Sequence, residues 1–140
     1  MVAPSETGSA ASAPPASWDA PTWNGEAQHL ANLGQWQVAI ACHKQALVLA
    51  PQDAAAWLGR GRCLGALGRL EEAIDCYSQA VAFNPQLATG WFSKALAEER
   101  IGRTQDAVYS YERYLAVASA QDAVPIGHAR RRLRELGDGG

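Results

Sequence analysis

The amino-acid sequence repeats every 34 residues, and this period constrains the fold more than any other feature of the chain. Four classes of position, occupied by tryptophan, glycine, alanine and proline, keep one register without insertion or deletion. They are Trp23, Trp57 and Trp91; Gly34, Gly68 and Gly102; Ala39, Ala73 and Ala107; and Pro51 and Pro85. The period predicts a solenoid in which three similar units are stacked side by side.

Each unit has the hydrophobic spacing of two amphipathic helices. The glycine in the middle of the unit is placed where a left-handed residue ends a first helix, and the proline near the end stops a second helix. Asp53 is placed to cap the helix that follows it. Each unit is therefore predicted to be a helical hairpin. In the central unit the two apolar faces are Trp57, Gly61, Leu64 and Leu67, and Ala73, Ile74, Tyr77, Ala80 and Val81.

Small residues are predicted to mark the contact between the two helices of each hairpin, because short side chains let the backbones approach closely. Large residues such as Trp57 and Tyr77 are expected to fill the space on either side of that contact. The small residues are Ala27, Gly61 and Ala95 in the first helices, and Ala39, Ala73 and Ala107 in the second helices.

The register of the repeat also sets the expected organisation of the chain. The N-terminal segment is rich in Ala, Pro and Ser, which predicts a disordered leader, with Trp18 packed onto the first helix. After the third unit, an amphipathic segment predicts a helix that caps the end of the solenoid. The predicted segments are a leader at 1–19, hairpins at 20–53, 54–87 and 88–121, a capping helix at 122–137, and a tail at 138–140.

The predicted capping helix carries an apolar stripe opposite a basic face. The stripe is expected to cover the third hairpin, and the basic face is interpreted as a solvated surface rather than a nucleic-acid contact. The stripe consists of Ile126, Ala129, Leu133 and Leu136, and the basic face of Arg130, Arg131, Arg132 and Arg134.

Composition argues against several classes of function. The formal net charge of −2 provides no overall field that attracts nucleic acid or an anionic membrane. No apolar run approaches the roughly 18 residues of a membrane span, and the N-terminus lacks a signal-peptide pattern, which favours residence in the cytoplasm. Cys42, Cys63 and Cys76 lack the spacing of a zinc site and are interpreted as small hydrophobic residues in helices.

The sequence contains no nucleophile elbow, no phosphate-binding loop and no zinc-protease motif. We therefore predict that the chain is not an enzyme, with no catalytic residue, no metal site and no cofactor. His29, His43 and His128 fall on three different elements and are interpreted as histidines on helix surfaces.

The repeated residues resemble the tetratricopeptide repeat (TPR) family, whose 34-residue pattern runs from Trp through Gly, Ala and an aromatic residue to Pro. The resemblance covers residues 20–121 and implies an all-α fold, an α-α superhelix of three helical hairpins followed by a capping helix. The central unit matches best, with Trp57, Gly61, Leu64, Ala73, Tyr77, Ala80 and Pro85.

The chain departs from the family pattern at several positions. In every unit a charged residue replaces the leucine before the small position, so this face of the first helix is expected to be wetter than usual. Three further positions differ in the third unit, as is common for a terminal repeat. The charged residues are Glu26, Arg60 and Lys94, and the further differences are Glu98, Tyr114 and Ser119.

The resemblance also implies a function, because in this family the first helices line a concave groove in which a partner's extended peptide or helix usually lies. The expected chain is thus a scaffold or adaptor that binds another protein. Leu58, Phe92 and Leu96 are expected to form an apolar strip in this groove, although they could instead pack between helices. The groove residues carried over are Asn24, Gln28, Asn32, Leu58, Arg62, Phe92, Ser93, Leu96, Glu99 and Arg100.

Two known specialisations of the family are not expected here. The clamp for chaperone C-terminal carboxylates needs cations at defined inward positions, where this chain has no cation, and an asparagine ladder is also missing. The clamp positions hold Asn24, Gln28, Gly59, Thr89 and Ser93, and the ladder positions hold Gly25, Gly59 and Ser93. Two other functions remain open, namely self-association or assembly through the convex face, and a role as the targeting module of a separate enzyme.

Overall fold

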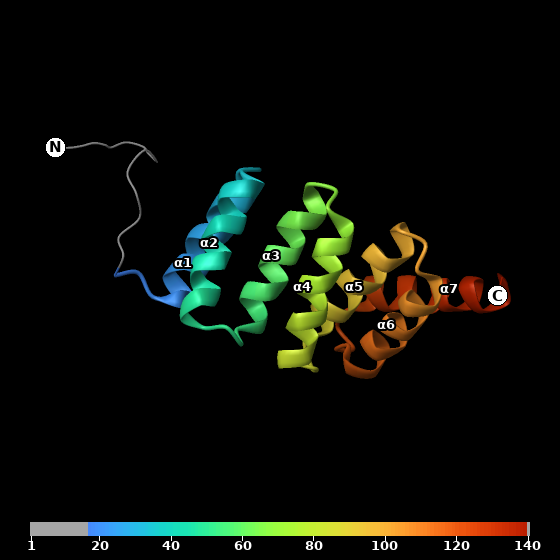
Figure 1. Ribbon diagram of the computed structural model, residues 1–140. Helices are drawn as coiled ribbons and strands as arrows, with labels where there is room; N and C mark the ends of the chain where they lie inside the picture. The colour runs from blue at the N-terminus through green and yellow to red at the C-terminus, as the bar shows by residue number, and fades with distance from the viewer. Residues whose placement is uncertain (1–16, 140) are drawn as a thin grey trace.

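The computed structural model describes residues 17–139, and within this range the backbone forms seven helices and no strand. The expected leader at 1–19 falls mostly outside the described residues. The seven helices are α1 (Ala20–Asn32), α2 (Trp36–Leu49), α3 (Ala54–Ala66), α4 (Leu70–Phe83), α5 (Ala88–Arg100), α6 (Thr104–Val117) and α7 (Ala123–Gly139). Figure 1 shows three hairpins, α1–α2, α3–α4 and α5–α6, following one another along the molecule, with α7 at the far end.

The turns within the hairpins form as the glycine spacing predicts. Gly34, Gly68 and Gly102 have backbone φ angles of 77°, 80° and 85°, in the left-handed region that only glycine adopts without strain. Each therefore ends the first helix of its hairpin and turns the chain into the second helix.

Hydrogen bonds at the repeat boundaries explain why proline and tryptophan recur together. The indole Nε1 of Trp57 donates to the carbonyl oxygen of Pro51 at 2.9 Å, and that of Trp91 donates to Pro85 at 2.9 Å. Asp53 caps α3 as predicted, because its Oδ1 accepts from the backbone nitrogen of Ala55 at 3.1 Å. Each bond ties one hairpin to the end of the preceding one.

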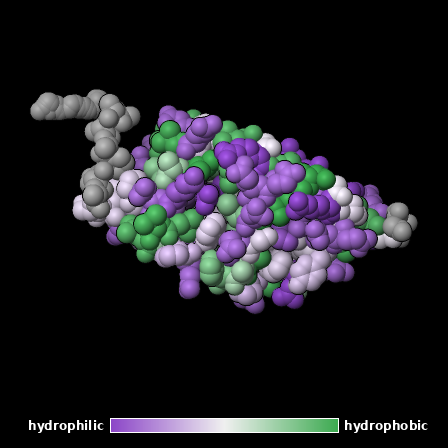
Figure 2. Space-filling view, in the orientation of Figure 1, coloured by the Kyte–Doolittle hydropathy of each residue, from purple (hydrophilic) through white to green (hydrophobic). Residues whose placement is uncertain are grey.

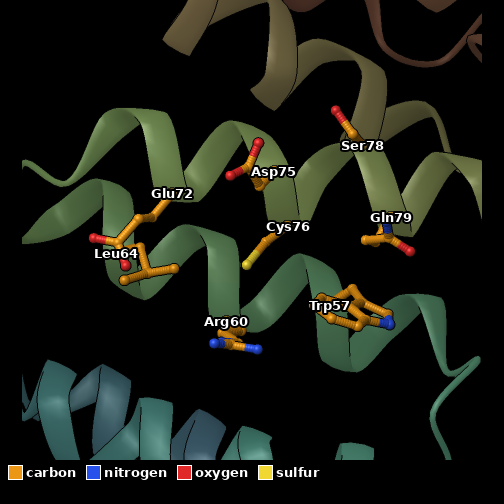
Figure 3. A pocket seen from close by; sticks show the side chains of 8 residues that line it. All are labelled: Trp57, Arg60, Leu64, Glu72, Asp75, Cys76, Ser78 and Gln79. Carbon is orange, nitrogen blue, oxygen red and sulfur yellow. The ribbon is translucent and has the colours of Figure 1, made fainter.

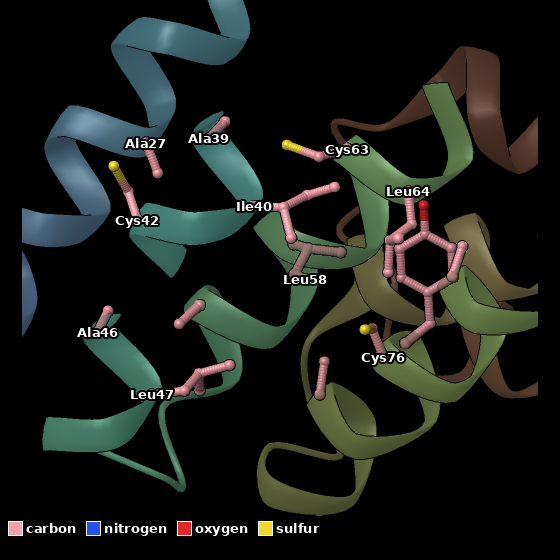
Figure 4. Packing of buried hydrophobic residues seen from close by; sticks show 14 of the residues in the cluster. Ala27, Ala39, Ile40, Cys42, Ala46, Leu47, Leu58, Cys63, Leu64 and Cys76 are labelled. Carbon is pink, nitrogen blue, oxygen red and sulfur yellow. The ribbon is translucent and has the colours of Figure 1, made fainter. Parts of the chain in front are cut away.

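The hydrophobic core runs between the hairpins and follows the predicted small residues. Ala27, Ala39, Ala73, Ala95 and Ala107 are all fully buried, and Figure 4 shows part of this packing. At Gly61, an added Cβ would lie 2.6 Å from a ring carbon of Tyr77, so the tyrosine ring fits here only because residue 61 has no side chain. Tyr77 is buried as expected, whereas Trp57 is half-buried at the edge of the core.

Cys42, Cys63 and Cys76 are buried free thiols, which agrees with their interpretation as small hydrophobic residues.

Both ends of the described chain pack onto the hairpins. Trp18 makes an edge-to-face contact with Trp23 at 5.0 Å between ring centroids, as expected from the sequence. At the other end, the buried Ala129 and its neighbours on α7 cover the third hairpin, although α7 extends to Gly139, past the expected boundary at 137. None of the helices within residues 17–139 combines the length and the hydrophobicity that a membrane span requires.

Candidate functional site

Three neighbouring hollows follow the surface formed by α1, α3 and α5, and Arg62 of α3 lines all three. We call this surface the inner groove. The first hollow, of about 230 Å³, lies between α1, α2 and α3. The second, of about 130 Å³, lies between α3, α5, α6 and the start of α7, and the third, of about 320 Å³, lies between α3, α4 and α5.

Six of the ten residues expected to line the groove face these hollows, and their side chains make no hydrogen bond or ion pair within residues 17–139. Leu96 and Arg100 are exposed beside the third hollow, and Ser93 is half-buried between the second and third. Arg62 is exposed at the centre of the groove. The six residues are Gln28, Asn32, Arg62, Ser93, Leu96 and Arg100.

Leu58 does not form part of an exposed apolar strip. Its side chain is 7% exposed and belongs to the core of the first two hairpins, as Figure 4 shows. The fifth position of this unit therefore turns toward the core, and the expectation of a groove-lining Leu58 was wrong. A charged substitution at Leu58 would test folding rather than binding.

Phe92 and Glu99 contact the capping helix rather than standing free in the groove. Phe92 packs against Tyr114, with 5.0 Å between ring centroids, and against His128 of α7 at 5.8 Å. Glu99 accepts hydrogen bonds from the hydroxyl of Tyr111 at 2.8 Å and from Nε of Arg132 at 2.7 Å. One side of Phe92 still lines the second hollow.

Ionisation of Glu99 is stabilised by its partners on α6 and α7. Burial acts to raise the pKa of Glu99, but the hydrogen bonds from Arg132 and Tyr111 outweigh it and lower the pKa overall. Arg132 pairs with Glu99 of α5 as well as with Glu135 of its own helix, and the contact with Glu99 holds it against the solenoid instead of in the predicted solvated basic face. The ion pair fixes α7 against α5.

A hydrogen-bonded chain of three side chains ends at His43, which lines the first hollow. Nδ2 of Asn24 donates to Oδ2 of Asp53 at 2.9 Å, and Oδ1 of Asn24 lies 3.0 Å from Nδ1 of His43. Asn24 therefore contributes to the groove by holding His43 in place. Asp53 links this chain to the N-terminus of α3, which it caps.

His43 is buried, with 2% of its side chain exposed, so its interpretation as a surface histidine was wrong. Burial lowers the pKa of His43 to about 4, although the charge of Asp53 acts in the opposite direction. The sequence contained the signal for its burial, because His43 stands one period before Tyr77 and two periods before Tyr111, which are both in the core.

A separate cleft of about 430 Å³ opens between α3 and α4 on the opposite side of α3 from Arg62. Figure 3 shows Arg60 and Trp57 on α3, with Asp75, Ser78 and Gln79 on α4. The guanidinium carbon of Arg60 lies 5.6 Å from the ring centroid of Trp57, a cation–π arrangement. Nε of Arg60 is buried without a hydrogen-bond partner within residues 17–139. We call this surface the outer cleft.

One departure of the third unit from the repeat pattern, Glu98, is compensated by two polar neighbours. Glu98 is 2% exposed, and its carboxylate accepts from Nζ of Lys94 at 2.8 Å and from Oγ of Ser110 at 2.6 Å. Lys94 occupies the charged position that precedes the small residue in each unit. The carboxylate is therefore paired and hydrogen-bonded inside the hairpin, where burial without partners would be costly.

Hydrophobic side chains gather on the surface of the first hairpin. Figure 2 shows a hydrophobic patch over α1 and α2, while much of the same face over the other helices is hydrophilic. Of the large hydrophobic residues that are exposed, four belong to this hairpin. They are Leu33, Val38, Val48 and Leu49, with exposed fractions of 59%, 51%, 73% and 54%.

Comparison with known proteins identifies the repeat. The family profile described as Tetratricopeptide repeat matches residues 24–88 and 64–123, which together make up most of the chain. A search of curated proteins found no match.

Three solved structures have a similar fold at low sequence identity. The first TPR domain of Spaghetti (RPAP3), bound to the HSP90 peptide SRMEEVD, gives a TM-score of 0.75 at 18% identity, covering 86% of this chain and 94% of that chain. The TPR2B-domain:pHsp70 complex of yeast Sti1 gives 0.77 at 17% identity, covering 86% and 98%.

The third is the Yersinia enterocolitica type III secretion chaperone SycD in complex with a peptide of the translocator YopD. It gives a TM-score of 0.78 at 18% identity, covering 84% of this chain and 91% of that chain. These structures share the arrangement of hairpins that the sequence period predicts. The chain belongs to the tetratricopeptide repeat family.

Proposed function

We propose that this chain is a non-catalytic adaptor that binds a short segment of a partner protein in the inner groove. The observation that supports this most directly is the run of three hollows around the exposed Arg62. Similar folds have been solved with peptides bound, including the HSP90 peptide on Spaghetti and the YopD peptide on SycD. A continuous run of hollows suits an extended segment better than a compact small molecule.

The accessible groove residues offer both polar and apolar contacts. Arg62 and Arg100 supply cationic donors, and Gln28 and Asn32 supply amides that can donate and accept. Leu96 supplies exposed apolar surface beside Arg100. This combination can satisfy the backbone polar groups of a bound peptide and bury one of its apolar side chains.

The proposal can be tested by selecting binders from a displayed library of random peptides. The selected peptides are then measured against Leu96→Glu and Arg62→Glu, both at exposed groove positions, after circular dichroism has shown that each variant is folded. We expect each groove variant to weaken binding by about tenfold or more, because each removes a contact and adds a charge.

The matched control for this experiment is Asp75→Lys, which changes an exposed charge at the outer cleft. It should leave the affinity within about twofold of the unchanged chain. Peptides that bind equally to the groove variants, but lose affinity for Asp75→Lys, would move the site to the outer cleft and refute the proposal.

The groove is not expected to clamp a chaperone C-terminal carboxylate, because the five clamp positions hold no cation. Two of them, Asn24 and Gly59, are taken up by the contacts of His43. The peptide SRMEEVD should therefore show no saturable binding by isothermal titration. Saturable binding that disappears when the terminal carboxylate is amidated would contradict this prediction.

Self-association is a second candidate function, favoured by the exposed hydrophobic side chains of the first hairpin. Val38, Val48 and Leu49 of α2 could be covered by a second copy of the chain. Sedimentation velocity over a dilution series distinguishes the two functions, because a dimer dissociates on dilution. A chain that stays monomeric at every concentration would exclude self-association and leave the adaptor proposal. Residence in the cytoplasm stays a prediction.

A further inference from the structure

The protonation pattern of His43 follows from Asp53, the one group in its hydrogen-bonded chain that can only accept. An ionised carboxylate only accepts hydrogen bonds, so the Asn24 amide must turn its NH₂ toward Asp53 and its oxygen toward His43. Nδ1 of His43 therefore carries the proton and donates to Oδ1 of Asn24. The second ring nitrogen, Nε2, is left with a lone pair that can accept a hydrogen bond.

The Nε2 edge of the ring packs against the backbone of α3 at Gly59, where the absence of a side chain leaves room for the ring. A Cβ added at Gly59 would lie 2.4 Å from Nε2 and 2.4 Å from Cε1 of His43. Within residues 17–139, Nε2 has no hydrogen-bond partner, and His43 contributes to the wall of the first hollow. Burial keeps the pKa of His43 near 4, so the acceptor stays available at neutral pH.

The first hollow combines this acceptor with a strong donor. Arg62 brings a guanidinium that can only donate, while the half-buried Trp36 provides an apolar wall. Gln28 and Asn32 lie at the same hollow and can adapt to either role. A side chain that fits here must donate to His43 and accept from Arg62.

We propose, building on the groove function above, that the first hollow is a subsite for a primary carboxamide, an asparagine or glutamine side chain of the bound segment. Its NH₂ group donates to Nε2 of His43, and its oxygen accepts from Arg62. The NH₂ group of a carboxamide matches the acceptor on His43, and its oxygen matches the donors on Arg62.

Other side chains match the hollow less well. A carboxylate satisfies Arg62 but places a second acceptor against Nε2 of His43. A lysine can donate to His43 but is repelled by Arg62. A leucine displaces water from Nε2 of His43 and from the guanidinium of Arg62 but forms no hydrogen bond with either group. A site built around hydrogen bonds discriminates strongly against such a ligand.

The test selects random heptapeptides on the full chain and, in parallel, on two variants. His43→Phe retains a ring but removes the acceptor, and the control Tyr109→Phe removes a hydroxyl from an exposed tyrosine of α6 that lines none of the three hollows. Both variants are checked for cooperative unfolding before selection. We expect one peptide position to be enriched in Asn or Gln on the unchanged chain and on Tyr109→Phe, and this enrichment to be lost on His43→Phe.

A second measurement needs no variant and remains informative if His43→Phe is unfolded. The ¹⁵N resonance of Nε2 is followed while a selected peptide is added, and again with a peptide whose carboxamide residue is replaced by Leu. We expect the first peptide to shift this resonance, and the Leu peptide to bind at least about tenfold more weakly and leave it unshifted.

Several results would overturn the subsite. They are enrichment in Ser, Thr, acidic or apolar residues instead of carboxamides, equal enrichment on His43→Phe, or an Nε2 resonance that does not respond to the carboxamide peptide. If selected peptides still lose affinity for Leu96→Glu, the groove proposal stands while the subsite fails. If they are insensitive to Leu96→Glu as well, both proposals fail.

Discussion

Gly25 and Gly59 occupy the same position in successive units but have different surroundings. An added Cβ at Gly25 would meet no atom within 4 Å, whereas at Gly59 it would meet the ring of His43 at 2.4 Å. Alanine is more favourable than glycine in a helix interior by roughly 0.5–1 kcal/mol. A substitution to alanine should therefore stabilise the fold unless the new Cβ clashes, as it would at Gly59 with the ring of His43.

We expect Gly25→Ala to raise the free energy of unfolding by about 0.5 kcal/mol and Gly59→Ala to lower it by roughly 1–3 kcal/mol. Chemical denaturation of the two variants measures the difference. Equal effects would show that His43 does not pack against Gly59 as described.

The buried neutral state of His43 makes the stability of the fold depend on pH. Its pKa is lowered from the usual 6.5 to about 4 by burial, so below pH 6.5 the unfolded chain takes up a proton that the folded chain does not. The free energy of unfolding contributed by this group therefore falls as pH decreases from about 6.5 to about 4, by on the order of 3 kcal/mol.

His43→Gln should flatten this part of the stability profile, measured by urea denaturation at a series of pH values. The variant is compared with itself at pH 7.5, so that any loss of packing cancels. A slope that is unchanged in His43→Gln would assign the proton uptake to another group.

At the scale of single helices, α7 contributes more than a hydrophobic cover. Its Arg132 reaches Glu99 of α5, while Arg130 on the same helix is exposed. We expect Arg132→Ala to lower the free energy of unfolding modestly, because the ion pair is partly solvated, and Arg130→Ala to change it much less.

Hydrogen exchange of the α7 amides should accelerate in Arg132→Ala and not in Arg130→Ala. Both substitutions remove one positive charge from the same helix, so a difference reports the contact with Glu99. Equal protection in the two variants would mean that apolar packing alone holds α7.

The helices themselves were predictable because their signals are local and repeated. The positive φ angles at Gly34, Gly68 and Gly102 follow from their position in the unit. The partner of Arg132 could not be predicted, because the sequence gives the apolar stripe of α7 but not the angle at which the helix crosses α5.

Across the whole molecule, the repeat specified the stack of hairpins but not the groove in detail. Arg62, Leu96 and Arg100 lie at the hollows as expected, since their register points them away from the paired helix. Leu58 was misplaced because a small rotation of a helix decides whether a border position faces the core, whereas the burial of His43 could have been predicted from its alignment with Tyr77 and Tyr111. The i,i+4 spacing of Lys94 and Glu98 is a signal within α5 alone, whereas the contact of Glu98 with Ser110 depends on how α5 and α6 pack.

Binding of a partner segment along the inner groove can be mapped by chemical-shift perturbation with a selected peptide. The ¹H–¹⁵N spectrum of the full chain is recorded during titration. We expect the largest shifts to cluster around Gln28, Asn32, Arg62, Ser93 and Arg100, on three helices that the hollows join. Shifts that cluster instead around Trp57, Asp75 and Gln79 at the outer cleft, or around Val38 and Val48 on the first hairpin, would contradict it.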